Sequence, residues 1–206
     1  MKIYNNKNVY EAAMERFEIV LNSFDNYYVS VSGGKDSSIM LQLMAKKARE
    51  IGKRFSVLYI DLEAQYKSTI DHVNELIDCT ADVVEDWYWV AMPLSLRNAV
   101  SAIQPKWICW DKKDKKKWVR EYPTKRKDVV LCAEDHYPDG WDWFFRGMEF
   151  EEFILYFAKW FNQKHGGCTA AGIGIRSDES LNRFRTIISN TKERFDGHGW
   201  TTRVKL

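Results

Sequence analysis

Two periodicities of apolar residues divide the chain into expected helices and strands. Runs rich in β-branched and aromatic residues predict short strands, whereas apolar residues at helical spacing predict helices. The strands are expected at residues 27–31, 55–60, 81–85 and 168–175. The helices are expected at residues 9–21, 37–51, 66–79, 94–103, 149–164 and 177–190. Strands that alternate with helices at these lengths indicate an α/β fold, an open parallel sheet of about five strands with helices on both faces.

The middle of the chain interrupts this alternation. Residues 87–147 contain most of the nine tryptophans and all four prolines, and they show little regular periodicity. An irregular stretch of this kind is typical of an insertion or a lid. We therefore expect a single domain over residues 1–206 that carries a Trp-rich insertion.

Composition changes this picture little. Hydrophobic residues make up 45% of the 206 positions and charged residues 29%, which is ordinary for a soluble globular protein. The formal net charge of +2 does not support nucleic-acid binding by the chain as a whole, so any basic surface must be local. The N-terminus shows no apolar signal core, and no run reaches the length of a membrane span. We expect a cytoplasmic protein without a membrane partner.

Candidate chemistry lies directly after the first of these strands. That strand leads into Ser32-Gly33-Gly34-Lys35-Asp36-Ser37, and a helix follows. Two glycines allow a tight turn and a close approach of the backbone to a ligand. The helix start adds free N–H groups and the positive end of a dipole, which together suit a phosphate. The hydroxyls of Ser32, Ser37 and Ser38 and the ammonium group of Lys35 add further donors.

This loop is neither of the two common phosphate-binding motifs, because it lacks both G-x-x-x-x-G-K-[ST] and G-x-G-x-x-G. Asp36 is unexpected beside an anion. It either caps the helix or helps to hold a Mg²⁺ ion that bridges the phosphates. A Gly-Gly turn followed by an Asp-Ser helix cap is the purely structural interpretation of the same residues.

The hexapeptide resembles the S-G-G-x-D-S loop of the PP-loop ATP pyrophosphatases. More narrowly, the chain resembles the phosphoadenosine phosphosulfate (PAPS) reductase family, over residues 25–190 with gaps in the middle. A second segment, from Gly174 to Arg183, is similar to the late G-x-R-x-x-E/Q-S-x-x-R segment of that family. The resemblance implies an adenine nucleotide alpha hydrolase-like fold. It also implies that an adenine nucleotide, ATP or a PAPS-like compound, is bound together with Mg²⁺.

The resemblance further implies roles for individual residues. The nucleotide would be bound by Ser30, Ser32, Gly33, Gly34, Lys35, Asp36, Ser37, Ser38, Asp61, Arg176, Glu179 and Arg183. Of these, Lys35, Asp36, Arg176 and Arg183 would be catalytic through positioning and charge neutralisation. Asp61 follows the second strand, where the family has an acidic residue near the adenosine. A ribose contact, a metal contact and a plain strand-end role all remain open for it.

The cysteines argue against reduction. Cys79, Cys109, Cys132 and Cys168 are widely spaced, which predicts neither a zinc knuckle nor an iron–sulfur cluster. Sulfonucleotide reductases of the family resemble one another in an E-C-G-x-H motif, whereas no cysteine follows Cys168 here. The resemblance then implies cleavage of ATP to AMP and pyrophosphate with adenylyl transfer, or action on a sulfonucleotide. The alternative is a nucleotide-binding accessory subunit of a nucleic-acid-modifying or defence complex.

Residues 112–127 form the strongest charge feature, and Trp110, Trp118 and Tyr122 are interleaved with it. Basic residues with stacking rings suit a single-stranded nucleic acid. The same residues can also close over the nucleotide or form a solvated loop. A protein partner and a homo-oligomer also remain open. Residues 107–110 and 118–120 resemble segments of larger proteins of the family, so a compact or truncated version is expected.

Overall fold

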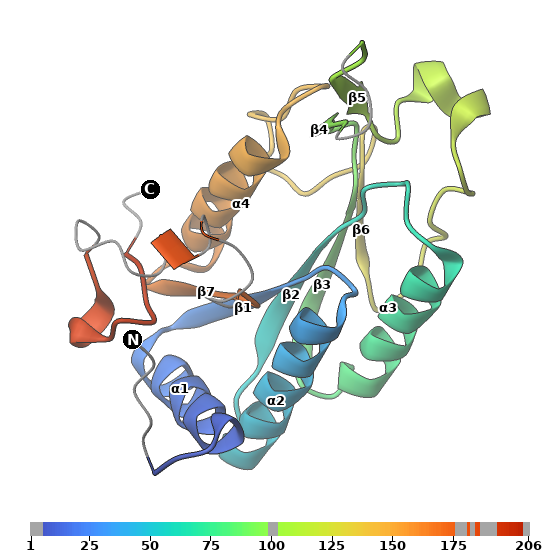
Figure 1. The fold of residues 1–206 in the computed structure, drawn as a ribbon. Helices are drawn as coiled ribbons and strands as arrows, with labels where there is room; N and C mark the ends of the chain where they lie inside the picture. Colours follow the sequence, from blue (N-terminus) through green and yellow to red (C-terminus); the bar gives the residue numbers. More distant parts are fainter. Residues whose placement is uncertain (1–5, 99–102, 176–180, 182–183, 186–192, 204–206) are drawn as a thin grey trace.

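A computed structural model describes residues 6–98, 103–175, 181, 184–185 and 193–203 (Figure 1). The helices are α1 (Val9–Ser23), α2 (Lys35–Ile51), α3 (Lys67–Thr80) and α4 (Phe150–His165), with short 3₁₀ helices η1 (Lys112–Lys117) and η2 (Phe195–Gly197). The strands are β1 (Asn26–Val31), β2 (Phe55–Ile60), β3 (Val84–Ala91), β4 (Ser95–Arg97), β5 (Lys106–Ile108), β6 (Val130–Ala133) and β7 (Thr169–Ile173). None of the helices in this described part combines the length and the apolar character needed to cross a bilayer.

The main sheet has five strands in the order β6-β3-β2-β1-β7, and every neighbouring pair is parallel. The chain moves outward from β1 through β2 and β3 to β6, and then returns to the other side of β1 to form β7. The strand order therefore reverses between β1 and β7. In open parallel sheets, the crevice beyond the carboxyl ends of the strands at such a reversal is the usual place for a ligand. The α/β fold and the five-stranded sheet that the sequence predicts are confirmed.

Helices cover both faces of this sheet, as two successive residues of β1 demonstrate. Tyr27 donates a hydrogen bond from its hydroxyl to the carbonyl oxygen of Leu21 in α1, at 2.9 Å. Tyr28 packs its ring edge-on against Phe157 and Phe161 of α4, with centroids 5.2 and 5.1 Å apart. Because neighbouring side chains of a strand point to opposite faces, α1 and α4 lie on opposite sides of the sheet. Figure 1 shows α2 and α3 on the same side as α1.

Two expectations about the middle of the chain are wrong. The strand expected at residues 81–85 begins only at Val84 and continues to Ala91. The helix expected at 94–103 is not formed over its described first part, where Ser95–Arg97 is strand β4, antiparallel to β5. The strand forms because Ser95, Leu96 and Arg97 pair with residues of β5, while Leu94 is fully buried and Leu96 packs against the core.

The Trp-rich stretch also contributes to the core. Its strand β6 pairs with β3 and completes one edge of the main sheet. Trp110 and Trp141 are almost completely buried, and the Trp141 ring packs edge-on against Trp160 of α4. These aromatic side chains therefore fill the interior, and composition by itself does not distinguish this role from stacking on a ligand.

Candidate nucleotide site

The predicted phosphate-binding loop, residues 32–37, which we call the phosphate loop, lies at the carboxyl end of β1. β1 is one of the two strands between which the strand order reverses. β1 ends at Val31, and α2 begins at Lys35 with Gly34 as its N-cap residue. Gly33 has a φ of +76°, and a Cβ atom there would lie 2.7 Å from Cγ2 of Thr69 in α3. Only glycine meets both conditions, because a side chain would be strained by the positive φ and would collide with α3. The loop thus follows β1 and packs closely against α3.

The start of α2 is open to an anion. Gly34 provides no side-chain cap, so the N–H groups of the first turn are not satisfied by a capping side chain and the dipole favours negative charge there. Lys35 exposes 76% of its side chain, and its Nζ lies 4.0 Å from the carboxylate of Asp36. Asp36 is the second residue of α2, and the N-cap position itself is held by Gly34. The ammonium group can therefore swing toward a bound phosphate.

The serines of the loop support its backbone. The hydroxyls of Ser37 and Ser38 both donate to the carbonyl oxygen of Gly34, at 3.0 and 2.8 Å. Ser37 and Ser38 are only 6% and 5% exposed. Oγ of Ser32 lies 3.1 Å from Oγ of Ser37, within hydrogen-bond distance. Ser30 lies within β1, paired with Leu58 on one side and with β7 on the other. In this geometry the hydroxyls stabilise the turn, and direct donation to a ligand remains a prediction.

The segment after β7 reaches the same loop. A Cβ atom on Gly174 would lie 3.3 Å from Cα and 3.4 Å from the backbone nitrogen of Ser37. Gly174 therefore packs directly on the first turn of α2, although the two residues are far apart in the sequence. Arg176, Glu179 and Arg183 lie outside the described residues, and their contacts with a nucleotide remain a prediction. What the structure establishes is that Gly174, two residues before Arg176 in the sequence, lies against Ser37.

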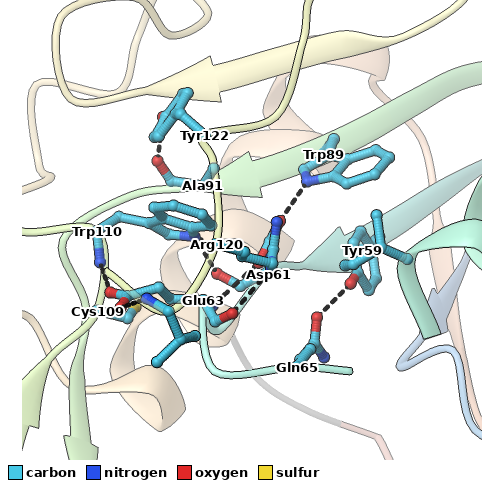
Figure 2. A network of polar contacts seen from close by, with 12 residues as sticks. Tyr59, Asp61, Glu63, Gln65, Trp89, Ala91, Cys109, Trp110, Arg120 and Tyr122 are labelled. Atoms are coloured by element: carbon cyan, nitrogen blue, oxygen red, sulfur yellow. Dashed lines mark hydrogen bonds and ion pairs between the residues drawn. The ribbon is translucent and has the colours of Figure 1, made fainter. Parts of the chain in front are cut away.

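Asp61, at the end of β2, lies in a buried polar network (Figure 2). Its carboxylate accepts hydrogen bonds from Nε1 of Trp89 at 2.8 Å and from the backbone N–H of Glu63 at 3.0 Å. It also forms an ion pair with the guanidinium group of Arg120. Its side chain is 0% exposed, so a ribose or metal contact would require this network to open. The strand-end role that the sequence left open agrees with the observed contacts, and a nucleotide contact remains a prediction.

Sequence reasoning did not select three members of this network. Glu63, at a φ of +64°, accepts from the backbone N–H of Trp110 at 2.7 Å. Nε1 of Trp110 donates to the carbonyl oxygen of Asp61 at 2.9 Å, and the Arg120 guanidinium lies 4.7 Å from the centre of the Trp110 ring. The available signal was the pair of segments at 107–110 and 118–120, which combine tryptophans with an arginine. Together these contacts attach the Trp-rich stretch to the carboxyl end of β2.

His72 is a further residue that sequence reasoning did not assign. It projects from α3, and its Nε2 lies 3.0 Å from Oγ of Ser38. The Ser38 hydroxyl already donates to Gly34, so the imidazole N–H is the donor in this pair. His72 thereby connects α3 to the N-cap of α2. No sequence spacing indicated this role, because residues 38 and 72 meet only through tertiary packing.

The cysteines do not provide a reactive thiol in the buried part of the fold. Burial raises the pKa of the Cys109 thiol to about 12, and burial also raises the pKa of Cys132 far above its usual range. A nucleophilic cysteine needs a low pKa instead. Cys79 and Cys168 are exposed. Among the described residues, no group of three or more His, Cys, Asp or Glu side chains gathers as a metal site.

The parallel sheet, the phosphate loop and the strand reversal define an α/β domain of the adenine nucleotide alpha hydrolase-like class. Residues 26–199 match the model of the phosphoadenosine phosphosulfate reductase domain, so the chain belongs to that family. It is 45% identical over 196 residues to "Uncharacterized protein YbdN" of Escherichia coli (strain K12). The match covers 95% of this chain but 45% of that relative, so the chain spans less than half of its length.

Proposed function

We propose that the domain binds an adenine nucleotide at the phosphate loop and cleaves ATP between its α- and β-phosphates with transfer of the adenylyl group. The observation that carries this proposal is the packing of Gly174 on Ser37. It brings Gly174, two residues before Arg176 in the sequence, to the start of α2, where backbone N–H groups and Lys35 favour an anion. In the proposal, Arg176 and Arg183 add positive charge at the same place.

The reaction requires no covalent protein intermediate. An acceptor oxygen attacks the α-phosphorus, the bond to the oxygen that bridges the α- and β-phosphates breaks, and pyrophosphate leaves with the bonding electrons. The acceptor proton passes to the solvent. Lys35, with the helix dipole, holds the negative charge of the leaving pyrophosphate. The raised pKa values of the buried Cys109 and Cys132 thiols support this chemistry over a reduction that would use either of them as the nucleophile.

Mg²⁺ fits the residues that are present. Asp36 stands beside Lys35 with 29% of its side chain exposed, and Mg²⁺ is commonly held by one or two carboxylates together with substrate phosphates and water. When bound, the ion would neutralise phosphate charge and orient the leaving group. Asp36 is the residue of the described loop that would hold it.

Thermal-shift titrations with ATP, AMP, adenosine phosphosulfate and PAPS test the binding step, because stabilisation follows ligand affinity. Lys35→Ala should remove most of the stabilisation, whereas the exposed Lys53→Ala should retain it and serves as the charge-matched control. Product analysis should show AMP and pyrophosphate once an acceptor is supplied. Release of ADP and phosphate, or equal stabilisation of both variants, would contradict the proposal. Binding without any turnover would favour the accessory-subunit alternative.

A further inference from the structure

The side chains of Arg120, Tyr122 and Arg126 attach the basic stretch at residues 112–127 to the fold. Arg120 forms the ion pair with Asp61 and donates from its Nε to the carbonyl oxygen of Glu63 at 2.8 Å. The Tyr122 hydroxyl donates to the carbonyl oxygen of Ala91 at 2.5 Å. Arg126 binds side chains of α3, including Asn74 at 3.0 Å. A solvated loop would need none of these contacts, so the fold holds this stretch in a defined position.

The stretch carries nine lysine and arginine side chains against two carboxylates, within a chain whose total charge is only +2. Its arginines, with Lys112 and Lys117, form ion pairs with carboxylates of the chain. Five exposed lysines have no ion pair within the described part of the structure: Lys113, Lys115, Lys116, Lys125 and Lys127. Fixing several like charges close together is unfavourable unless an anion neutralises them. The geometry therefore favours a ligand with several negative charges spread along its length.

A hollow opens on the same surface, with a volume of about 520 Å³. It is lined by Lys115, Trp118, Arg120, Glu121 and Tyr122. The rings of Trp118 and Tyr122 lie 5.6 Å apart, and Nζ of Lys115 is 5.9 Å from the centre of the Trp118 ring. Flat rings beside cationic side chains are the combination that binds unpaired bases together with their phosphates.

The hollow lies on the same edge of the sheet as the phosphate loop. Arg120 is held at the carboxyl end of β2 and Tyr122 at that of β3, while the loop follows β1, which neighbours β2. Strands in a sheet are about 4.8 Å apart, so these attachment points lie one and two strand spacings from the loop. The hollow and the nucleotide site therefore lie off the same edge of the sheet.

We propose that this surface binds a single-stranded nucleic acid and presents it to the nucleotide site as the acceptor. The acceptor role rests on the proposed function, whereas strand binding does not. The exposed lysines neutralise the phosphates, and Trp118 with Tyr122 contacts a base. The proposal excludes a role as an open loop, because the contacts of Arg120, Tyr122 and Arg126 fix the surface before any ligand arrives.

Fluorescence anisotropy with a labelled single strand of about 16 nucleotides tests strand binding in the absence of ATP. The titration is repeated at several salt concentrations. The variant Lys115→Ala/Lys116→Ala should weaken binding about tenfold and lower the salt slope by about 1.4, since each phosphate contact to a single strand contributes about 0.7. The control Lys53→Ala/Lys159→Ala removes the same charge from other exposed positions and should leave both quantities unchanged. Equal losses in the two double variants would overturn the proposal.

Competition distinguishes the strand from other polyanions. Unlabelled single strand should displace the label, whereas duplex of the same sequence and polyglutamate should compete at least tenfold less well. Equal competition by either would overturn the assignment to a single strand. The thermal-shift titrations with ATP keep the two proposals separate, since the Lys115→Ala/Lys116→Ala variant should retain full nucleotide stabilisation. If the unmodified protein is stabilised by ATP but binds no single strand, this inference alone is refuted and the proposed function stands.

Discussion

Gly174 packs against the backbone of Ser37, so closely that a Cβ atom at position 174 would lie 3.3 Å from Cα of Ser37. This contact joins the segment after β7 to the first turn of α2. Gly174→Ala should push these two backbones apart and destabilise the fold by about 1–3 kcal/mol, the usual cost of overpacking. Nucleotide stabilisation in a thermal-shift titration should fall with it. Gly199→Ala, where nothing lies within 4 Å, is the control and should behave as the unmodified protein.

Gly33 and Gly52 separate backbone strain from steric collision. Both have positive φ, +76° and +68°, but a Cβ on Gly33 would meet Thr69 at 2.7 Å, whereas one on Gly52 would meet nothing within 4 Å. Gly52→Ala should lower the free energy of unfolding by about 1 kcal/mol, because a residue with a Cβ is strained in the left-handed conformation. Gly33→Ala should cost more and should also reduce nucleotide affinity. Urea unfolding of both variants measures the difference, and equal losses would show that α3 does not constrain the loop.

The ion pair between Arg120 and Asp61 should matter for stability because Asp61 is completely buried. Arg120→Met leaves the carboxylate without its cation and should cost about 3 kcal/mol. Adding Asp61→Asn should recover part of this loss, since the buried charge is then removed. A double-mutant cycle by urea unfolding measures the coupling. Lys67→Met, which breaks the exposed pair with Asp71, is the control and should change stability little. Additive effects of the two changes would contradict a direct interaction.

His72 should act on the phosphate loop through Ser38. His72→Ala removes the donor to Oγ of Ser38, so the loop should lose one support and the dissociation constant for ATP should rise several-fold. His72→Gln retains an N–H donor and should restore most of the affinity. Isothermal titration of both variants provides the measurement. An unchanged dissociation constant for His72→Ala would show that Ser38 is held adequately by Gly34 alone.

The four cysteines should fall into two classes toward a thiol reagent. Cys79 and Cys168 are exposed and should react in the native protein, whereas Cys109 and Cys132 are buried and have raised pKa values. These two should react only after unfolding. The raised pKa values also predict how the free energy of unfolding depends on pH. Below about pH 8.5, the pKa of a thiol in the unfolded chain, the buried thiols do not lower it. Above that pH the unfolded chain ionises first, so the free energy of unfolding declines as the pH rises toward the native pKa values. Rapid native labelling of four thiols would contradict this assignment.

Local pattern was sufficient for most of the helices and for the phosphate loop. The ends of α1, α2, α3 and α4 lie within two residues of their expected positions, because amphipathic periodicity and glycine stops act over short distances. The helix expected at 94–103 was wrong for a tertiary reason. Leu94 is buried against the core and Leu96 packs on it, while Ser95 and Arg97 pair with β5. The periodicity of a segment by itself does not reveal which other strand it pairs with.

By itself, the sequence determined that residues 32–37 form a Gly-Gly turn between a strand and a helix, since φ preferences and hydrogen-bond donors are properties of neighbouring residues. Only the tertiary structure decided that β7 returns beside β1, that Gly174 meets Ser37, and that Arg120 neutralises Asp61. Those relationships depend on which distant surfaces can be buried together at close packing. Packing of this kind is decided by the whole fold at once, and no single segment of the chain encodes it.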